Sequence, residues 1–236
     1  MSEMTQSAKG AGQKACRRCG TCCARGGPAL HKQDVSLVED GVVSPRDLVT
    51  VRHGEPVFDF GKNRYVPLQG EIIKIRGGDA GWACRFHHPE KRACAIYSRR
   101  PSECAAMKCW DTSEIEAMYA KGRITRLELL SRESDLLAFM ARHDRRCSYA
   151  RLGRLVRMLE EPDAEKAQAA IIDTVEFDEN ARREVVERFG KPADAVDFFL
   201  GRQITYLLDV FGLRVRDAGG KKFLVRARAG DGEPEG

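Results

Sequence analysis

The sequence predicts an α+β fold, in which a small cysteine-rich, metal-bound module with short strands and helices precedes a mainly α-helical module. Eight of the nine cysteines lie in the first half of the 236 residues. Short apolar stretches punctuated by Gly and Asn follow the first cysteines and are typical of strands. From residue 113 onward, apolar residues recur at helical spacing instead. We therefore expect a flexible leader, a cysteine-cluster domain, a helical domain and a flexible tail, at residues 1–14, 15–112, 113–216 and 217–236.

Composition and charge limit the classes of function. Apolar residues make up 42% of the chain, and 40 basic residues nearly balance 35 acidic ones, for a net charge of +5. Such a mild imbalance does not favour nucleic acid as a partner. The polar N-terminus lacks the apolar core of a secretion signal, and no segment has the apolar length needed to cross a bilayer. We therefore expect a cytoplasmic protein without a membrane role, in a compartment that keeps thiols reduced.

The cysteine-rich half carries signals for short helices and strands. Asp34 is expected to cap a helix over 35–40, while Ser44 and Pro45 are typical of a second helix start. Strand-like stretches follow at 57–60, 64–68 and 71–75. Both groups of cysteines are thus expected in loops around a small α+β core.

The second half is expected to be helical. The segments Ser113-x-x-Glu116 and Thr125-x-x-Glu128 match the capping box that begins many helices. One helical stripe then follows, formed by Leu136, Met140, His143 and Cys147. After a helix around 171–175, Asp178 is expected to cap another that runs to Phe189. The strongest amphipathic helix is expected over 196–211.

The spacing of the cysteines is the strongest functional signal. Four form the run Cys16-x2-Cys19-x2-Cys22-Cys23, and four follow as Cys84-x9-Cys94-x9-Cys104-x4-Cys109. Disulfides would need an export route that the sequence does not show, so metal is the better explanation. The Cys-x2-Cys-x2-Cys run is typical of iron–sulfur ligation, whereas zinc usually takes four ligands in a closed tetrahedral site. All eight residues are therefore candidate ligands of an iron–sulfur cluster or Zn²⁺.

The number of thiols leaves two arrangements open. Eight cysteines can supply two complete zinc sites, or one four-cysteine iron–sulfur cluster with thiols to spare. Neighbouring side chains point in different directions, so Cys22 and Cys23 are not expected to bind one ion together. Since the first run supplies three well-placed sulfurs, at least one ligand must come from the downstream group. A bound metal would then tie the two groups together.

These residues resemble a known family. The run Cys16–Cys23, then Cys84-x-Phe86, Cys94-x-Ile96-Tyr97-x2-Arg100-Pro101-x2-Cys104 and Cys109, is similar to the YkgJ-type cysteine-cluster family over residues 16–110. The resemblance implies a zinc- or iron-chelating domain. A similar cluster occurs in flagellin lysine N-methylases, so the resemblance also leaves a methyltransferase open.

Two residues of this motif can act on the charge of the site. Pro101 is suited to the first position of a helix, which would place Cys104 in the first turn, where the helix dipole favours a thiolate. Arg100 could offset the negative charge that thiolates leave on a bound metal, and we treat it as a candidate cofactor-binding residue. Arg99 is the other candidate for this role.

The remaining cysteine and the histidines are expected to be structural. Cys147 continues an apolar stripe and is predicted to be a small core residue. His87 and His88 could donate nitrogen, but eight sulfurs make this unnecessary, and we expect them in a polar loop. The other histidines occur singly in the sequence and are also expected to be structural: His31, His53 and His143.

The leading hypothesis is a cytosolic protein that holds an iron–sulfur cluster or zinc and serves in redox chemistry, electron transfer or iron handling. Iron is favoured because zinc needs neither the cysteine run nor spare thiols. One rival is a cluster-containing methyltransferase or oxidoreductase, although nucleotide-binding and nucleophile-elbow motifs are missing. Another rival is a zinc-stabilised interaction module. The helical module could present a surface to an unidentified protein partner.

Overall fold

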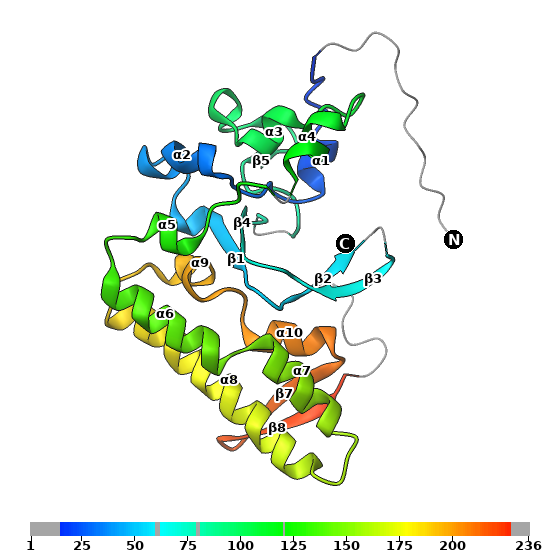
Figure 1. The fold of residues 1–236 in the computed structure, drawn as a ribbon, viewed down its shortest axis with the longest axis vertical. Coiled ribbons are helices and arrows are strands. Elements are labelled where there is room, and N and C mark those ends of the chain that lie inside the picture. Colours follow the sequence, from blue (N-terminus) through cyan, green and yellow to red (C-terminus); the bar gives the residue numbers. More distant parts are fainter. Residues whose placement is uncertain (1–14, 60–61, 79–80, 120, 228–236) are drawn as a thin grey trace. The chain divides into compact units, whose positions relative to one another are not determined.

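The structure is a computed structural model that describes residues 15–59, 62–78, 81–119 and 121–227 (Figure 1). The chain forms two compact units, and each is built from two separate stretches of sequence. Unit 1 comprises Met1–Val42 and Ile75–Arg123, and unit 2 comprises Val43–Lys74 and Ile124–Gly236. The predicted leader lies outside the described residues.

Unit 1 contains short helices and one two-stranded sheet, as the α+β prediction requires. Its strands β5 (His87–His88) and β6 (Ala93–Cys94) pair in antiparallel fashion. The helices and 3₁₀ turns are α1 (Thr21–Ala24), η1 (Lys32–Asp34), α2 (Val35–Glu39), η3 (Tyr97–Arg99), α3 (Ser102–Ala106) and α4 (Ser113–Met118). Elements this short cannot build a large core by themselves, so this unit depends on polar contacts and, we expect, on metal.

Unit 2 holds the long helices and three two-stranded sheets. Its helices and 3₁₀ turns are η2 (Pro45–Asp47), α5 (Arg126–Leu129), α6 (Ser134–Arg146), α7 (Tyr149–Met158), α8 (Ala164–Glu187), η4 (Ala193–Ala195), α9 (Val196–Leu200) and α10 (Ile204–Val210). The strands are β1 (Leu48–Val51), β2 (Pro56–Asp59), β3 (Arg64–Pro67), β4 (Ile72–Ile75), β7 (Leu213–Ala218) and β8 (Lys221–Arg226), and they pair as β1–β4, β2–β3 and β7–β8.

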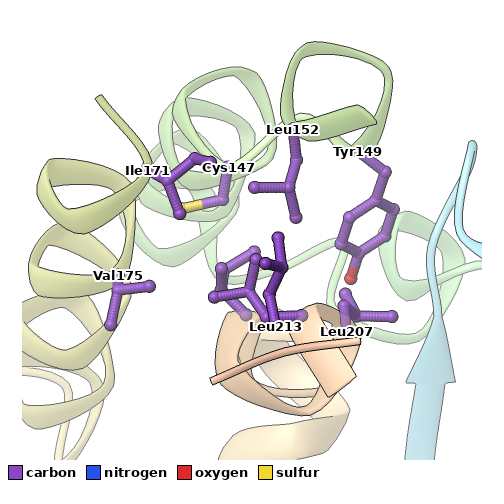
Figure 2. Close-up of a cluster of buried hydrophobic side chains, with 9 residues drawn as sticks. Cys147, Tyr149, Leu152, Ile171, Val175, Leu207 and Leu213 are labelled. Atoms are coloured by element: carbon purple, nitrogen blue, oxygen red, sulfur yellow. The ribbon is translucent and has the colours of Figure 1, made fainter. Parts of the chain in front are cut away.

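The hydrophobic core of unit 2 confirms the helical stripe read from the sequence. Cys147 is fully buried. It lies in a cluster with Tyr149 and Leu152 of α7, Ile171 of α8 and Leu207 of α10 (Figure 2). Helices α6 and α8 run side by side in Figure 1. The prediction that Cys147 is a small core residue is therefore confirmed.

Asp178 does not begin a new helix at its own position, although its carboxylate caps α10 through the backbone N–H of Ile204. It lies in the interior of α8, which is continuous where the sequence suggested two helices. Its buried carboxylate accepts hydrogen bonds from His143, 2.8 Å away, from Arg182 at 3.0 Å and from the backbone N–H of Ile204 at 3.1 Å. A tertiary network thus replaced the local capping role that the residue type suggested.

The predicted helix over 196–211 is broken at Gly201. This residue has φ 74°, in the left-handed region, and it separates α9 from α10. Its carbonyl accepts a hydrogen bond from Arg182 at 2.6 Å. A Cβ at this position would lie 2.9 Å from Cγ of Arg52, so the packed arginine side chain also excludes a larger residue.

Part of the predicted tail has regular secondary structure. Residues 217–226 belong to the β7–β8 hairpin and are not a flexible tail, and the rest of that tail beyond 227 lies outside the described residues. The boundary near residue 112 remains a prediction, since the compact units interleave along the chain. Within the described residues, no helix combines the length and apolar character needed to cross a membrane.

Candidate metal centre

The N-terminal cysteine run folds into a tight turn followed by one short helix. Arg18 and Gly20 both take positive φ values, 55° and 80°, on either side of Cys19. The Cys19 thiol lies 3.3 Å from the hydroxyl of Thr21, and this hydrogen bond lowers the pKa of Cys19. Helix α1 then carries Cys22 and Cys23. The turn presents its first sulfurs at the surface, because Cys16, Cys19 and Cys22 are exposed.

The downstream cysteines come from three different pieces of structure. The backbone N–H of Cys84 donates a 2.8 Å hydrogen bond to the carbonyl of Cys23, which joins the two groups directly. Cys94 lies in β6, Cys104 lies in α3, and Cys109 is exposed beyond that helix. The expectation that both groups lie in loops is therefore only partly correct, because α1, β6 and α3 carry several of the thiols.

Five of the eight candidate thiols share one neighbourhood. The thiols that act on one another electrostatically are those of Cys22, Cys23, Cys84, Cys94 and Cys104. Burial, reinforced by the thiol of Cys22, raises the pKa of Cys23 to about 12. Burial also raises the pKa of Cys84. The three other candidate thiols are exposed, and they are those of Cys16, Cys19 and Cys109.

Cys104 corrects an electrostatic expectation. It does lie in the first turn of α3, which begins directly after Pro101. Burial and then the thiols of Cys84 and Cys23 raise its pKa, so the thiol form is favoured over the thiolate. A five-residue helix has a weak dipole, and the cost of desolvating a thiolate exceeds that attraction.

The donor set fits a thiophilic metal. The nine cysteines, all of which lie in the described chain, form no disulfide, and five of them are gathered from the two stretches of sequence that make up unit 1. Among the described residues, one set of three potential ligands has all its donor atoms within 4.8 Å of one another, and it consists of His143, Cys147 and Asp178. No three sulfurs of the group of five, whose residues are all described, are that close to one another. A single ion at the five thiols would therefore draw at least three of the sulfurs closer together. A metal would also stabilise the thiolates that burial now disfavours.

A polar clamp positions the helix that carries Cys104. The Asp34 carboxylate accepts hydrogen bonds of 2.8 Å from both the backbone N–H and the hydroxyl of Ser102, at the start of α3. Glu103 accepts a 2.7 Å hydrogen bond from the backbone of Ala29 and lies 3.0 Å from Nε2 of His31. Asp34 thus caps α3. The sequence had suggested that Asp34 caps α2, the helix that directly follows it, but its side chain makes no capping bond there.

Arg100 stacks on an aromatic ring of the motif. Its guanidinium lies 4.4 Å from the centre of the Tyr97 ring, and it donates a 3.1 Å hydrogen bond to the Tyr97 carbonyl. Arg18, from the N-terminal run, lies 4.1 Å from the same ring. Two cations therefore meet at Tyr97 and link the two halves of the motif. Arg99 is held by Asp40 instead.

Sequence reasoning missed the buried ionic network of unit 2. Asp144 lies 2.7 Å from Arg52 and 2.8 Å from Arg126, and both arginines are almost completely buried. Arg126 also pairs with Glu71 at 2.6 Å. In the sequence, the acidic residues of the helical half are interleaved with basic ones, and this pattern does not distinguish surface pairs from buried ones. His143 likewise belongs to this interior rather than standing alone.

The comparison with protein families agrees with this geometry. Residues 15–121 match the CxxCxxCC family model, which is described as "Putative zinc- or iron-chelating domain". The resemblance inferred from the cysteine spacing is thus confirmed for this segment. The expected cofactors, Zn²⁺ or an iron–sulfur cluster, agree with the description of the family. Neither the curated proteins nor the solved structures contain a significant match to the chain.

Proposed function

We propose that this protein holds an iron–sulfur cluster through the cysteines of unit 1 and uses it in redox chemistry, electron transfer or iron handling. The observation that carries the proposal is the gathering of five thiols from α1, β6, α3 and the segment before β5. Of these thiols, Cys84 is buried and Cys23, Cys94 and Cys104 are partly buried, and iron–sulfur clusters are held by such clustered thiolates. Cys16 and Cys19 precede Cys22 in the same run and are further candidate sulfurs.

The proposed ligands divide into two sets. Cys23, Cys84 and Cys104 are the innermost thiols and Cys22 and Cys94 complete the group of five. The exposed thiols supply further ligands or resolve oxidised sulfur: Cys16, Cys19 and Cys109. Arg100, held against Tyr97, supplies positive charge on the same motif. A cytosolic setting, where thiols stay reduced, suits a site whose ligands are cysteine thiolates.

Zinc is the second candidate, and a different observation favours it. Trp82 and Tyr119 of unit 1 each expose 65% of their surface, which suits an interaction module stabilised by metal. Under this alternative the cysteines hold two structural ions, and the aromatic side chains contact a protein partner. The helical unit could contribute to the same role.

Anaerobic purification followed by metal and sulfide analysis and a visible spectrum tests both candidates. Brown protein that contains iron and acid-labile sulfide supports the proposed cluster. Colourless protein with about two equivalents of zinc, the number that eight thiolates can hold at four per ion, supports the alternative. Protein without either metal contradicts both.

A further inference from the structure

His87 is placed between two cysteines of the group of five. In the β5–β6 pair it lies directly opposite Cys94. Its backbone N–H donates a 2.8 Å hydrogen bond to the carbonyl of Cys84. The sequence suggested a polar loop here, but the residue belongs to a short paired strand that brings it to the downstream thiols.

The imidazole ring of His87 also reaches the N-terminal run. A Cβ added to Gly20 would lie 2.4 Å from Nε2 and 2.7 Å from Cε1 of His87, so the ring edge packs directly on the glycine backbone. Gly20 is buried and follows Cys19. The ring edge that carries Nε2 therefore faces the segment from which the first cysteines come.

Both ring nitrogens of His87 lack a hydrogen-bond partner in the described part of the chain, and both are shielded from solvent. Leaving a buried polar group unsatisfied costs about 1–3 kcal/mol. The buried His31 differs, because its Nδ1 lies 2.7 Å from the Lys121 carbonyl and its Nε2 lies 3.0 Å from Glu103. His88, the next residue, is exposed. A metal held by the gathered thiols would satisfy one of the two nitrogens of this imidazole, whose strand pairs with that of Cys94.

We propose that Nε2 of His87 is a nitrogen ligand of the metal that the cysteines hold, and that the site is therefore a mixed cysteine–histidine site. Nε2 directs its lone pair at the ion, and Nδ1 carries the remaining proton. Zinc and iron–sulfur centres both accept imidazole in place of thiolate. The exchange leaves the site with one negative charge fewer, and in an iron–sulfur cluster this raises the reduction potential. This inference rests on the proposed metal-binding function.

X-ray absorption at the edge of the metal in anaerobically purified protein tests the assignment. The wild type, His87→Ala, His87→Cys and His88→Ala are compared, with metal content measured in parallel. We expect the multiple-scattering pattern of an imidazole in the wild type and in His88→Ala, and its absence from both His87 variants. For zinc, the nitrogen distance is about 2.0–2.1 Å, against about 2.3 Å for sulfur. His87→Cys should keep its metal with an all-sulfur shell.

Three results would overturn the assignment. They are an all-sulfur shell in the wild type, an imidazole pattern that persists in a His87 variant, and loss of metal from His87→Cys, where a thiolate is itself a competent ligand. Absence of metal from the wild type would overturn the proposed function as well. Metal bound by sulfur alone would overturn only the role of His87.

Discussion

At the scale of single residues, burial alone does not distinguish a ligand from a core residue. Cys84 and Cys147 are both buried, with 9% and 0% of their surfaces exposed. Cys84 has thiol neighbours at Cys22 and Cys94, whereas Cys147 packs among the apolar side chains of unit 2. The chemistry of the neighbours therefore assigns the two sulfurs to different roles.

Replacing each of these cysteines by alanine tests the distinction. Cys84→Ala should remove a ligand and lower the metal content of the purified protein severalfold or more. Cys147→Ala should leave the metal content unchanged and cost about 1 kcal/mol of stability, an ordinary value for a core substitution. Metal analysis beside urea denaturation checks both. Equal metal loss in the two variants would show that Cys147 belongs to the metal site.

The protonation of His143 should make the stability of unit 2 depend on pH. Burial opposes its protonation, but Asp144 and Asp178 outweigh this and raise the pKa of His143 to about 9. Asp178, at 2.8 Å, is the hydrogen-bonded partner, since the Asp144 oxygen is 3.8 Å from Nδ1. A raised pKa means that the folded state binds the proton more tightly. The resulting stability is fully present below about pH 6.5 and is lost as the pH rises to about 9.

We expect the free energy of unfolding to fall by about 3 kcal/mol, which is the equivalent of a pKa shift of His143 from 6.5 to about 9. Urea unfolding followed by far-UV circular dichroism between pH 6 and 9.5 measures it. In His143→Gln, which cannot titrate, the stability should be lower at pH 6 and nearly independent of pH over this range. The same pH slope in wild type and variant would contradict the assignment.

At the scale of elements, contacts distant in sequence decide where several helices begin and end. Helix α3 is capped by Asp34, which lies 68 residues earlier in the chain. The predicted box at Thr125 and Glu128 does form, because both partners are local. The box predicted at Ser113 and Glu116 does not form, because α4 has Thr112 at its N-cap and no side-chain capping bond. Local signals thus predicted only some of the local caps, and the cap of α3 could not be found from neighbouring residues.

The Asp34 cap should matter for metal binding, because α3 carries Cys104. Asp34→Ala removes the acceptor for Ser102, and losing a cap costs about 0.5–2 kcal/mol. If this cost falls on the metal-bound form, the apparent affinity should drop roughly 2–30-fold. Competition with a chelator measures the change.

Asp47→Ala is the matched control. Asp47 accepts a 2.8 Å hydrogen bond from the backbone of Ser44, at a cap in unit 2 that carries no cysteine. Its loss should leave the affinity for metal unchanged. An affinity that falls equally in both variants would indicate a general effect on folding rather than the positioning of Cys104.

At the scale of the whole molecule, the two units differ in what holds them together. Unit 2 has an apolar core and a buried ionic network, whereas unit 1 has short elements, polar clamps and clustered thiols. A structural zinc site can contribute roughly 10–16 kcal/mol of apparent binding energy. This is comparable to or larger than the net stability of about 5–15 kcal/mol of a typical domain. Unit 1 should therefore depend on metal far more than unit 2 does.

Removing the metal should unfold unit 1 and spare unit 2. Both tryptophans of the chain, Trp82 and Trp110, lie in unit 1, so tryptophan fluorescence reports on that unit alone. The long helices α6 and α8 lie in unit 2 and dominate the far-UV signal. Trp82 is already exposed, but Trp110 is partly buried, so anaerobic chelation should shift the fluorescence of Trp110 to that of exposed tryptophan while most helical signal remains. Native-like fluorescence and near-UV spectra after chelation would contradict the prediction.

The sequence by itself determined the α+β class, the family of the cysteine segment, the apolar stripe that ends at Cys147 and the set of candidate thiols. These features follow from residue type and short-range spacing, which local geometry translates directly into structure. Only the tertiary structure decided which five thiols gather, that Asp34 caps the Cys104 helix, that Asp178 binds His143, and that Gly201 breaks a helix. Each of these depends on side chains far apart in the chain, whose burial and charge act only after the fold has brought them together.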